Sequence, residues 1–430
     1  MVNSGIPWMG KIPSNWRIGK VKHFYRFITG FTPDSKNESF YDENGTPWVT
    51  ISDMDGKYVV GTKNGISPNY ISAKNPTLVP SNSLLYSFKL SVGQVARTTF
   101  DVYTNEAIAS FLPLDNISLD YLFYSSQVCI IENANENIYG AKLLNQDLIN
   151  NATILFPPLE EQQKIASFLD RKCDEIDEMI ALQEKIIEEL KAYKQSVITE
   201  AVTKGLNPDV PMKDSGIEWI GEIPERWSLY RIKYNTFLKG RIGWQGLNSN
   251  DFIDEGYCLI TGTDFDNKGG INWDTCYRIS KERFDEDELL HIKNGDLLMT
   301  KDGTVGKMAY IQNLPEEASL NSHLLIIRQT TNIISNEFLY WVMLSNVFKR
   351  FCSIYQSGSI MSSISQSTLG MMSCYCPSIE EQNSIVTYLK TKCTEIDSLI
   401  NIKLSKIDSL KEYKKSIIYE YVTGKKEITE

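Results

Sequence analysis

The chain has 430 residues, 42% of them hydrophobic, and a formal net charge of −10, so it can bury several cores but carries no basic excess of the kind that attracts nucleic acid. This length predicts two to four domains. No apolar run is long enough to span a bilayer, and residues 1–10 do not resemble a signal peptide. Eight scattered cysteines with no C-x-x-C pair, and only three histidines, predict no metal site and fit reduced thiols in a cytoplasmic protein.

The first sixteen residues form a leader segment that recurs 211 residues later. The leader of the first copy and its counterpart share seven residues: Gly5, Ile6, Trp8, Gly10, Ile12, Pro13 and Trp16 match Gly216, Ile217, Trp219, Gly221, Ile223, Pro224 and Trp227. A repeat of this period indicates that one structural plan is used twice in the chain.

The first body follows the leader and consists of short β-like stretches broken by Gly, Pro and Asn. One stretch, residues 83–88, leads into Lys89, Gln94 and Arg97, which we take as candidate binding residues of this body. An apolar helix is expected over residues 119–129.

A long helix is predicted next, because residues 159–204 contain neither Pro nor Gly. It opens with Pro157-Pro158-Leu159-Glu160-Glu161-Gln162-Gln163, where proline and carboxylates suit a helix N-terminus, and it stops at Gly205. The opening returns 220 residues later as Pro377-Ser378-Ile379-Glu380-Glu381-Gln382-Asn383, which predicts a second long helix. A rod of about 45 residues would be roughly 65 Å long.

Apolar residues recur along both long helices in a heptad pattern. We expect these positions to form the contact between the helices or with a partner: Leu169, Ile176, Met179, Ile186 and Leu190 in the first helix, and Leu389, Ile396, Leu399, Leu410 and Ile417 in the second. Two related helices in one chain can bury these stripes against each other as a coiled pair. The alternative is two separate core helices.

The second body diverges from the first in sequence but keeps the same rhythm of short strands. Its candidate binding residues are Lys301, Thr304 and Lys307 in Lys-Asp-Gly-Thr-Val-Gly-Lys, with Arg241 and Gln245 in a separate glycine-rich loop. In the first body the matching stretch reads Lys89-Leu-Ser-Val-Gly93, which leaves a shared role for Gly303 and Thr304 in doubt.

These observations predict an α+β fold in which two mixed α/β domains are joined by two long antiparallel coiled-coil helices in a pseudo-twofold repeat. The expected boundaries are 1–156 for the first recognition domain, 157–205 for the first helix, 206–376 for the linker and second recognition domain, and 377–430 for the second helix. Repeated helices beside divergent bodies indicate one scaffold that presents two different readers.

The two helix openings and the two Gly-x-Ile-Pro-x-x-Trp leaders resemble the specificity subunit of type I restriction–modification systems, and the likeness covers essentially the whole chain. The resemblance implies that each body is a target recognition domain reading one half of a split, asymmetric sequence in double-stranded DNA. The candidate binding residues of both bodies thereby become candidate DNA contacts. It also implies that the helices dock two copies of an adenine methyltransferase subunit, that a translocating restriction endonuclease subunit joins the complex, and that this chain itself does no chemistry.

No catalytic motif contradicts that implication. The sequence lacks a phosphate-binding G-x-x-x-x-G-K-[ST] loop, a methyltransferase Asn-Pro-Pro-Tyr loop and an acid–base cluster. We therefore expect no cofactor on this chain, with S-adenosylmethionine in the methyltransferase, and ATP and Mg²⁺ in the restriction subunit. The acidic charge is compatible with a second hypothesis, a coiled-coil scaffold whose two bodies bind proteins and not DNA. A single-chain nuclease or methyltransferase is a third.

Overall fold

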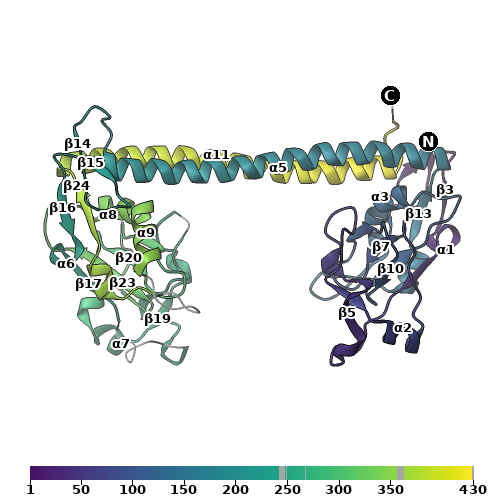
Figure 1. The fold of residues 1–430 in the computed structure, drawn as a ribbon, viewed down its shortest axis with the longest axis horizontal. Coiled ribbons are helices and arrows are strands. Elements are labelled where there is room, and N and C mark those ends of the chain that lie inside the picture. Colours follow the sequence, from purple (N-terminus) through teal and green to yellow (C-terminus); the bar gives the residue numbers. More distant parts are fainter. Residues whose placement is uncertain (242–246, 248, 267, 356–362, 429–430) are drawn as a thin grey trace. The chain divides into compact units, whose positions relative to one another are not determined.

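The computed structural model describes residues 1–241, 247, 249–266, 268–355 and 363–428. The chain divides into two compact units, and each unit takes part of each long helix. Unit 1 comprises Met1–Gln183 and Ser405–Glu430, and unit 2 comprises Glu184–Leu404. The first long helix is α5 (Leu159–Lys204) and the second is α11 (Ile379–Val422), as the proline-free and glycine-free runs predict (Figure 1).

The body of unit 1 is built on a four-stranded antiparallel sheet of order β4-β10-β7-β8. Beside it lies a three-stranded sheet of order β6-β5-β9, in which β5 and β9 run parallel. The strands of this unit are β1 (Val2–Asn3), β2 (Lys11–Ile12), β3 (Arg17–Lys20), β4 (Phe27–Thr29), β5 (Tyr41–Val49), β6 (Asn64–Ile66), β7 (Leu84–Ser87), β8 (Val95–Arg97), β9 (Tyr103–Thr104), β10 (Ile108–Phe111), β11 (Asn135–Glu136), β12 (Lys142–Leu143) and β13 (Thr153–Phe156), and its short helices are α1 (Val21–Phe24), α2 (Pro68–Lys74), α3 (Leu119–Cys129) and α4 (Gln146–Asn151).

The body of unit 2 repeats this topology although its sequence has diverged. Its four-stranded sheet has the order β17-β23-β20-β21, and its three-stranded sheet has the order β19-β18-β22 with one parallel pair. The elements are β14 (Met212–Asp214), β15 (Glu222–Pro224), β16 (Ser228–Arg231), α6 (Ile232–Asn235), β17 (Thr236–Lys239), β18 (Tyr257–Ile260), β19 (Tyr277–Ile279), α7 (Lys281–Asp285), β20 (Leu297–Thr300), β21 (Met308–Tyr310), β22 (Ala318–Leu320), β23 (Leu324–Gln329), α8 (Asn336–Leu344), α9 (Asn346–Tyr355), α10 (Gln366–Gly370) and β24 (Ser373–Cys376).

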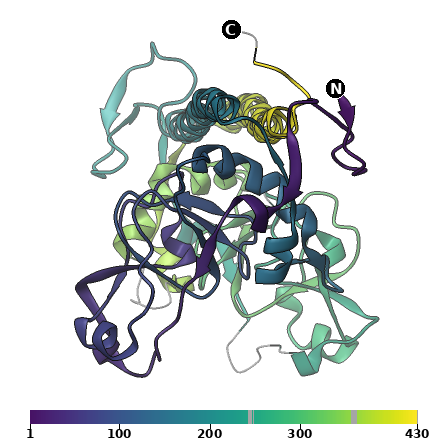
Figure 2. The same cartoon turned by 90° about the vertical axis from the view of Figure 1, so that its right-hand side faces the viewer.

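In each unit, α5 and α11 pack against each other in an antiparallel direction. In unit 1 the ring of Phe168 packs on Tyr421 and Asp177 pairs with Lys414, so the residue numbers fall along α11 as they rise along α5. Figure 2 looks along the two helices and shows them side by side above the strands of unit 1. The core of unit 1 includes Ile176 of α5 together with Leu410, Ile417 and Val422 of α11. The predicted α+β fold with antiparallel long helices is therefore confirmed within each unit.

Each leader closes the end of the long helix that belongs to the other repeat. In unit 1, Tyr419 of α11 donates a hydrogen bond from its hydroxyl to the carbonyl of Trp8 (2.8 Å), and a side chain at Gly424 would collide with Pro13. In unit 2, the second leader packs in the same way on the end of α5, where Gly205 lies against Trp227. Gly205 and Gly424 both have positive φ angles and end their helices in the left-handed conformation.

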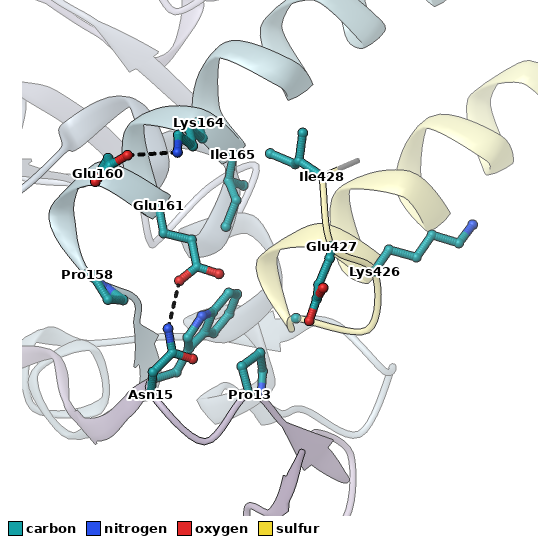
Figure 3. A pocket seen from close by; sticks show the side chains of 12 residues that line it. Pro13, Asn15, Pro158, Glu160, Glu161, Lys164, Ile165, Lys426, Glu427 and Ile428 are labelled. Atoms are coloured by element: carbon teal, nitrogen blue, oxygen red, sulfur yellow. Dashed lines mark hydrogen bonds and ion pairs between the residues drawn. The ribbon is translucent and has the colours of Figure 1, made fainter. Parts of the chain in front are cut away.

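A cavity of about 410 Å³ lies in unit 1 where the leader meets the start of α5 and the end of α11 (Figure 3). Asn15 donates a hydrogen bond to Glu161 across it (3.2 Å), and Glu160 pairs with Lys164 (2.7 Å). The carboxylates of Glu160 and Glu161 lie in the first turn of α5, where they neutralise the positive end of the helix dipole. The cavity is therefore a junction whose charges are already balanced by its own walls.

Candidate nucleic-acid interface

The turn between β7 and β8 and the turn between β20 and β21 have the same length and share two backbone hydrogen bonds, which join the last residue of the first strand to the residues six and seven positions later. The amide of Gly93 donates to the carbonyl of Ser87 (3.0 Å), as the amide of Gly306 donates to Thr300 (2.9 Å). Both glycines have positive φ angles, +93° and +87°, which a side chain would disfavour. We call residues 88–94 and 301–307 the hairpin turns of the two bodies.

This equivalence corrects the sequence alignment by one residue. The sequence alone places Lys89 beside Lys301, because both are lysines that follow a strand. The hydrogen bonds instead make Lys89 structurally equivalent to Asp302, and Gln94 equivalent to Lys307. The two bodies therefore carry different side chains at the same two positions of the same turn.

Three of the candidate DNA contacts are exposed at these turns, namely Lys89, Thr304 and Lys307. Lys301 is partly buried, and its backbone amide bonds to the carbonyl of His323 (2.9 Å). Gln94 is also partly buried and donates its side-chain amide to the carbonyl of Met54 (2.6 Å).

The two candidate arginines are structural. Arg97 is 8% exposed and binds Asp120 (2.6 Å) and the carbonyl of Asn82 (3.0 Å). Arg241 is 1% exposed and binds Glu286, Ser319 and the carbonyl of Leu320. Burial lowers the pKa of Arg241, and the partner Glu286 opposes that shift. Neither guanidinium faces solvent in this structure, so neither presents itself to a ligand. The other candidate of that glycine-rich loop, Gln245, lies outside the described residues.

A second shared turn follows the central strand of each three-stranded sheet, and the sequence reasoning did not single it out as a site. In the first body, Asp53 accepts hydrogen bonds from the amide (2.8 Å) and hydroxyl (2.7 Å) of Thr50. In the second body, Asp264 accepts the same two bonds from Thr261 (2.7 and 2.8 Å). The repeat of Thr-x-x-Asp after both strands was the available signal. We call residues 50–53 and 261–264 the Thr-Asp turns.

The Thr-Asp turn and the hairpin turn of one body lie next to each other. The bond from Gln94 to Met54 joins them in the first body. In the second body, Gly262 faces the side chain of Thr300, whose methyl group would lie 3.3 Å from an added Cβ. Ser52 and Thr263 keep exposed hydroxyls on the Thr-Asp turns, so each body presents hydroxyl and ammonium groups from neighbouring turns. Such groups are typical of phosphate and base-edge contacts.

The helix seam differs from the predicted pattern at its second position. At the first position, Leu169, Ile176, Leu389, Ile396, Leu410 and Ile417 are buried and Leu190 is partly buried. Met179 and Leu399 are instead 42% and 46% exposed, and Ile186 is partly exposed. These three therefore do not lie buried between the two helices, and contact with a partner stays the prediction for them.

The true second position follows the first by four residues and not by three. It is occupied by Cys173, Ile180, Ile187 and Lys194 in α5, and by Cys393, Ile400, Ile407 and Lys414 in α11. A hydrophobic pattern does not select this position, because two of its residues are lysines. Lys194 and Lys414 reach across the seam to pair with Asp397 and Asp177 (both 2.6 Å). Burial raises the pKa of Cys173 and of Cys393 to about 11, so both seam thiols stay neutral at physiological pH.

Large apolar side chains remain exposed on the long helices, and six of them form pairs that are 220 residues apart. The pairs are Met179 and Leu399, Leu182 and Ile402, and Tyr193 and Tyr413. Apolar side chains at such spacing on a helix surface mark contact sites for other proteins. Their duplication indicates a surface that the chain presents twice.

The family model of the type I restriction modification DNA specificity domain matches residues 13–192 and 243–412. The chain belongs to this family. It therefore carries two DNA specificity domains, each consisting of one body and much of one long helix. Specificity subunits of this family are not enzymes by themselves.

Curated specificity subunits match this chain over most of its length. The MjaVIII specificity subunit of Methanocaldococcus jannaschii is 24% identical over 96% of this chain and 94% of its own length. The EcoBI specificity subunit of Escherichia coli is 26% identical over 65% of this chain and 60% of its own length.

Solved structures share the fold. A chain from a study of complex assembly and conformational transition in a type I R-M system has a TM-score of 0.73 at 17% identity, covering 96% of this chain and 98% of its own. The HsdS subunit of Thermoanaerobacter tengcongensis has a TM-score of 0.53 at 16% identity, covering 99% and 100%.

No group of three or more His, Cys, Asp or Glu side chains within the described ranges is arranged to hold a metal ion. None of the helices within those ranges is long and apolar enough to cross a membrane.

Proposed function

We propose that the two bodies read the two halves of a split, asymmetric sequence in double-stranded DNA. The observation that carries this proposal is the pair of hairpin turns, which share length, backbone bonds and glycine conformation but differ in side chains. Lys89 stands where the second body has Asp302, and Gln94 stands where it has Lys307. A shared backbone with different donors and acceptors would place two readers alike on DNA while they recognise different bases.

The exposed groups at these turns are assigned different tasks. Lys89 and Lys307, as mobile ammonium groups, suit phosphate oxygens or guanine. Thr304, Ser52 and Thr263 offer hydroxyls that serve either phosphate or base edges. Arg97 and Arg241 hold the bodies together and are left out of the proposed reading surface.

The long helices are proposed to dock two copies of an adenine methyltransferase subunit. The repeated exposed side chains support this: Met179 and Leu182 have counterparts in Leu399 and Ile402, so two identical partners would each find an equivalent surface. A restriction and translocation subunit would join the same complex. S-adenosylmethionine would then bind to the methyltransferase, and ATP and Mg²⁺ to the restriction subunit, with no cofactor on this chain.

The net charge of −10 favours a second function, a scaffold whose two bodies bind proteins. One experiment distinguishes this scaffold from a DNA-reading subunit. The chain is expressed with the methyltransferase encoded beside it in a host without other adenine methylation, and the DNA is sequenced by a method that detects methyladenine. We expect one split motif with methyladenine in both halves. Absence of new methylation while the two proteins co-purify would contradict DNA reading and support the scaffold.

Body exchange then assigns the halves. Replacing residues 17–156 with the body of another family member should change one half of the motif and leave the other half and the gap unchanged. A change in both halves would contradict the assignment of one half to each body.

A further inference from the structure

A groove of about 1380 Å³ lies within unit 2, between the second body and the neighbouring turns of α5 and α11. Six lysines line it, Lys191, Lys194, Lys268, Lys307, Lys349 and Lys390, against three acidic residues, Asp266, Glu337 and Asp397. This excess of positive charge stands out in a chain whose net charge is −10. We call it the cationic groove.

Unit 1 shows what the chain places at the equivalent point. There Lys57 pairs with Asp170 of α5, and the hydroxyl of Tyr124 donates to the same carboxylate (2.5 Å). The hydrogen bond and burial together raise the pKa of Tyr124. A carboxylate, an ammonium group and an aromatic donor thus tie the first body to its helix.

The repeat identifies the counterparts of these three residues in unit 2. Lys57 lies four residues after the aspartate of its Thr-Asp turn, as Lys268 does in the second body. Tyr124 lies six residues after the helix N-cap Ser118, as Trp341 does after Ser335. Asp170 lies 220 residues before Lys390. The carboxylate of unit 1 is therefore replaced by an ammonium group in unit 2.

In the described part of unit 2, no other side chain supplies Lys268 with the carboxylate partner that Asp170 gives to Lys57. Lys390 pairs with Glu337, and Lys194 pairs with Asp397. Within the described residues, the ammonium groups of Lys268 and Lys307 have no hydrogen-bond or ion-pair partner. The indole nitrogen of Trp341, which also lines the groove, is buried without an acceptor. Buried donors normally find a partner.

We propose that the cationic groove binds an acidic polypeptide segment of a partner protein, whose carboxylate occupies the position that Asp170 fills in unit 1. In the chain without DNA, the segment pairs with Lys268 and Lys307, and its apolar side chains contact the aromatic walls. Because unit 1 fills its own site, the chain binds one such segment and not two.

The walls favour a polypeptide over duplex DNA. Phe265, Trp273, Tyr310, Tyr340 and Trp341 all line the groove. Apolar surface of this kind is matched by apolar side chains, and aromatic residues flanked by cations are typical centres of protein interfaces. The phosphates of duplex DNA bring charge but no flexible apolar groups, so they would leave these walls without a partner.

Binding can be measured with the full chain and a fluorescein-labelled 14-residue peptide in which glutamates alternate with leucine and phenylalanine. We expect one peptide per chain, affinity that falls as salt rises, and no binding of the same peptide with glutamine in place of glutamate. Lys268→Glu combined with Lys307→Glu should weaken binding at least about tenfold. Lys293→Glu is the matched control, since Lys293 is exposed on the same body but does not line the groove, and it should bind as the unaltered chain does.

A second variant copies the arrangement of unit 1. Lys390→Asp would set a carboxylate beside Lys268, and we expect it to abolish peptide binding while the urea midpoint of unfolding changes little. Equal binding of the glutamine peptide, equal loss in Lys293→Glu, or full binding by Lys390→Asp would each overturn the proposal. So would a loss of duplex-DNA affinity in Lys268→Glu/Lys307→Glu without any loss of peptide affinity, because the groove would then serve phosphates.

Discussion

The side-chain oxygen of Gln162 accepts a hydrogen bond from the backbone amide of Ser118 (3.0 Å). Gln162 is fully buried, and its side-chain nitrogen donates to the carbonyl of Pro157 (2.8 Å). Gln382 repeats both bonds with Ser335 (2.9 Å) and Pro377 (3.0 Å). One glutamine thus joins the first turn of a long helix to the start of α3 or α8, which explains why the helix opening recurs in both copies.

Replacing Gln162 with alanine should lower the free energy of unfolding by about 1–3 kcal/mol, because a buried amide and a buried carbonyl lose their partners. The neighbouring Gln163 is exposed, and Gln163→Ala is the matched control with an expected effect within about 0.5 kcal/mol. Urea unfolding of both variants checks this. Equal stability of the two variants would show that the buried bonds do not matter.

Substitutions in the buried seam should lower stability, whereas substitutions on the exposed apolar surface should weaken partner binding. Ile176 is 2% exposed in the core of unit 1, and Ile176→Asp should destabilise the chain by at least about 3 kcal/mol through an unpaired buried charge. Met179 lies three residues further on at the surface, so Met179→Asp should fold normally but weaken binding of the proposed methyltransferase partner. Thermal unfolding and co-purification measure the two effects. Normal docking by a folded Met179→Asp variant would exclude this surface as the docking site.

The lysines of the hairpin turns and the buried arginines should behave differently in DNA binding. Lys89→Ala and Lys307→Ala should leave folding intact. Where the lysine contacts a phosphate, each should reduce the slope of log binding constant against log salt concentration by about one. Arg97→Ala should instead destabilise the first body by about 2 kcal/mol, because the carbonyl of Asn82 loses its buried donor. Binding titrations of the assembled complex at several salt concentrations, together with urea unfolding, test both expectations. An unchanged salt slope in both lysine variants would remove the hairpin turns from the interface.

The seam thiols predict a loss of stability in alkali. Cys173 and Cys393 have folded-state pKa values of about 11, whereas an unfolded thiol ionises near pH 8.5, at roughly its ordinary pKa. Above pH 8.5 the unfolded chain therefore releases protons that the folded chain keeps, and stability falls as pH rises. We expect a loss of about 2 kcal/mol per thiol between pH 8 and pH 10. The Cys173→Ala/Cys393→Ala variant should lose less over that interval in urea titrations, and an equal loss would assign the effect to other groups.

The sequence was sufficient for the long helices, since uninterrupted heptads and the bounding Pro157 and Gly205 limit where they begin and end. It was not sufficient for the second seam position. Lys194 and Lys414 occupy that position as ion-pair partners, so a pattern judged by hydrophobicity selects the wrong neighbours, Met179 and Ile186.

The candidate interface was predictable only in part. The hairpin turns could be located from their glycines, but their alignment depends on hydrogen bonds that equate Lys89 with Asp302. The burial of Arg97 and Arg241 depends on residues distant in sequence, such as Asp120 and Glu286. The identity of the two Thr-Asp turns was visible as a short repeat, but their closeness to the hairpin turns arises from the tertiary fold.

The division of α11 between the two units has a consequence for biosynthesis. The core of unit 1 includes Leu410, Ile417 and Val422, whereas unit 2 is complete by Leu404. During translation the first body therefore leaves the ribosome long before the residues that finish its core, and the second unit can close first. Until those residues are made, unit 1 keeps apolar core surface exposed. Slow synthesis, or a chain that ends soon after Leu404, should therefore make the first body, and not the second, a target for chaperones and proteases.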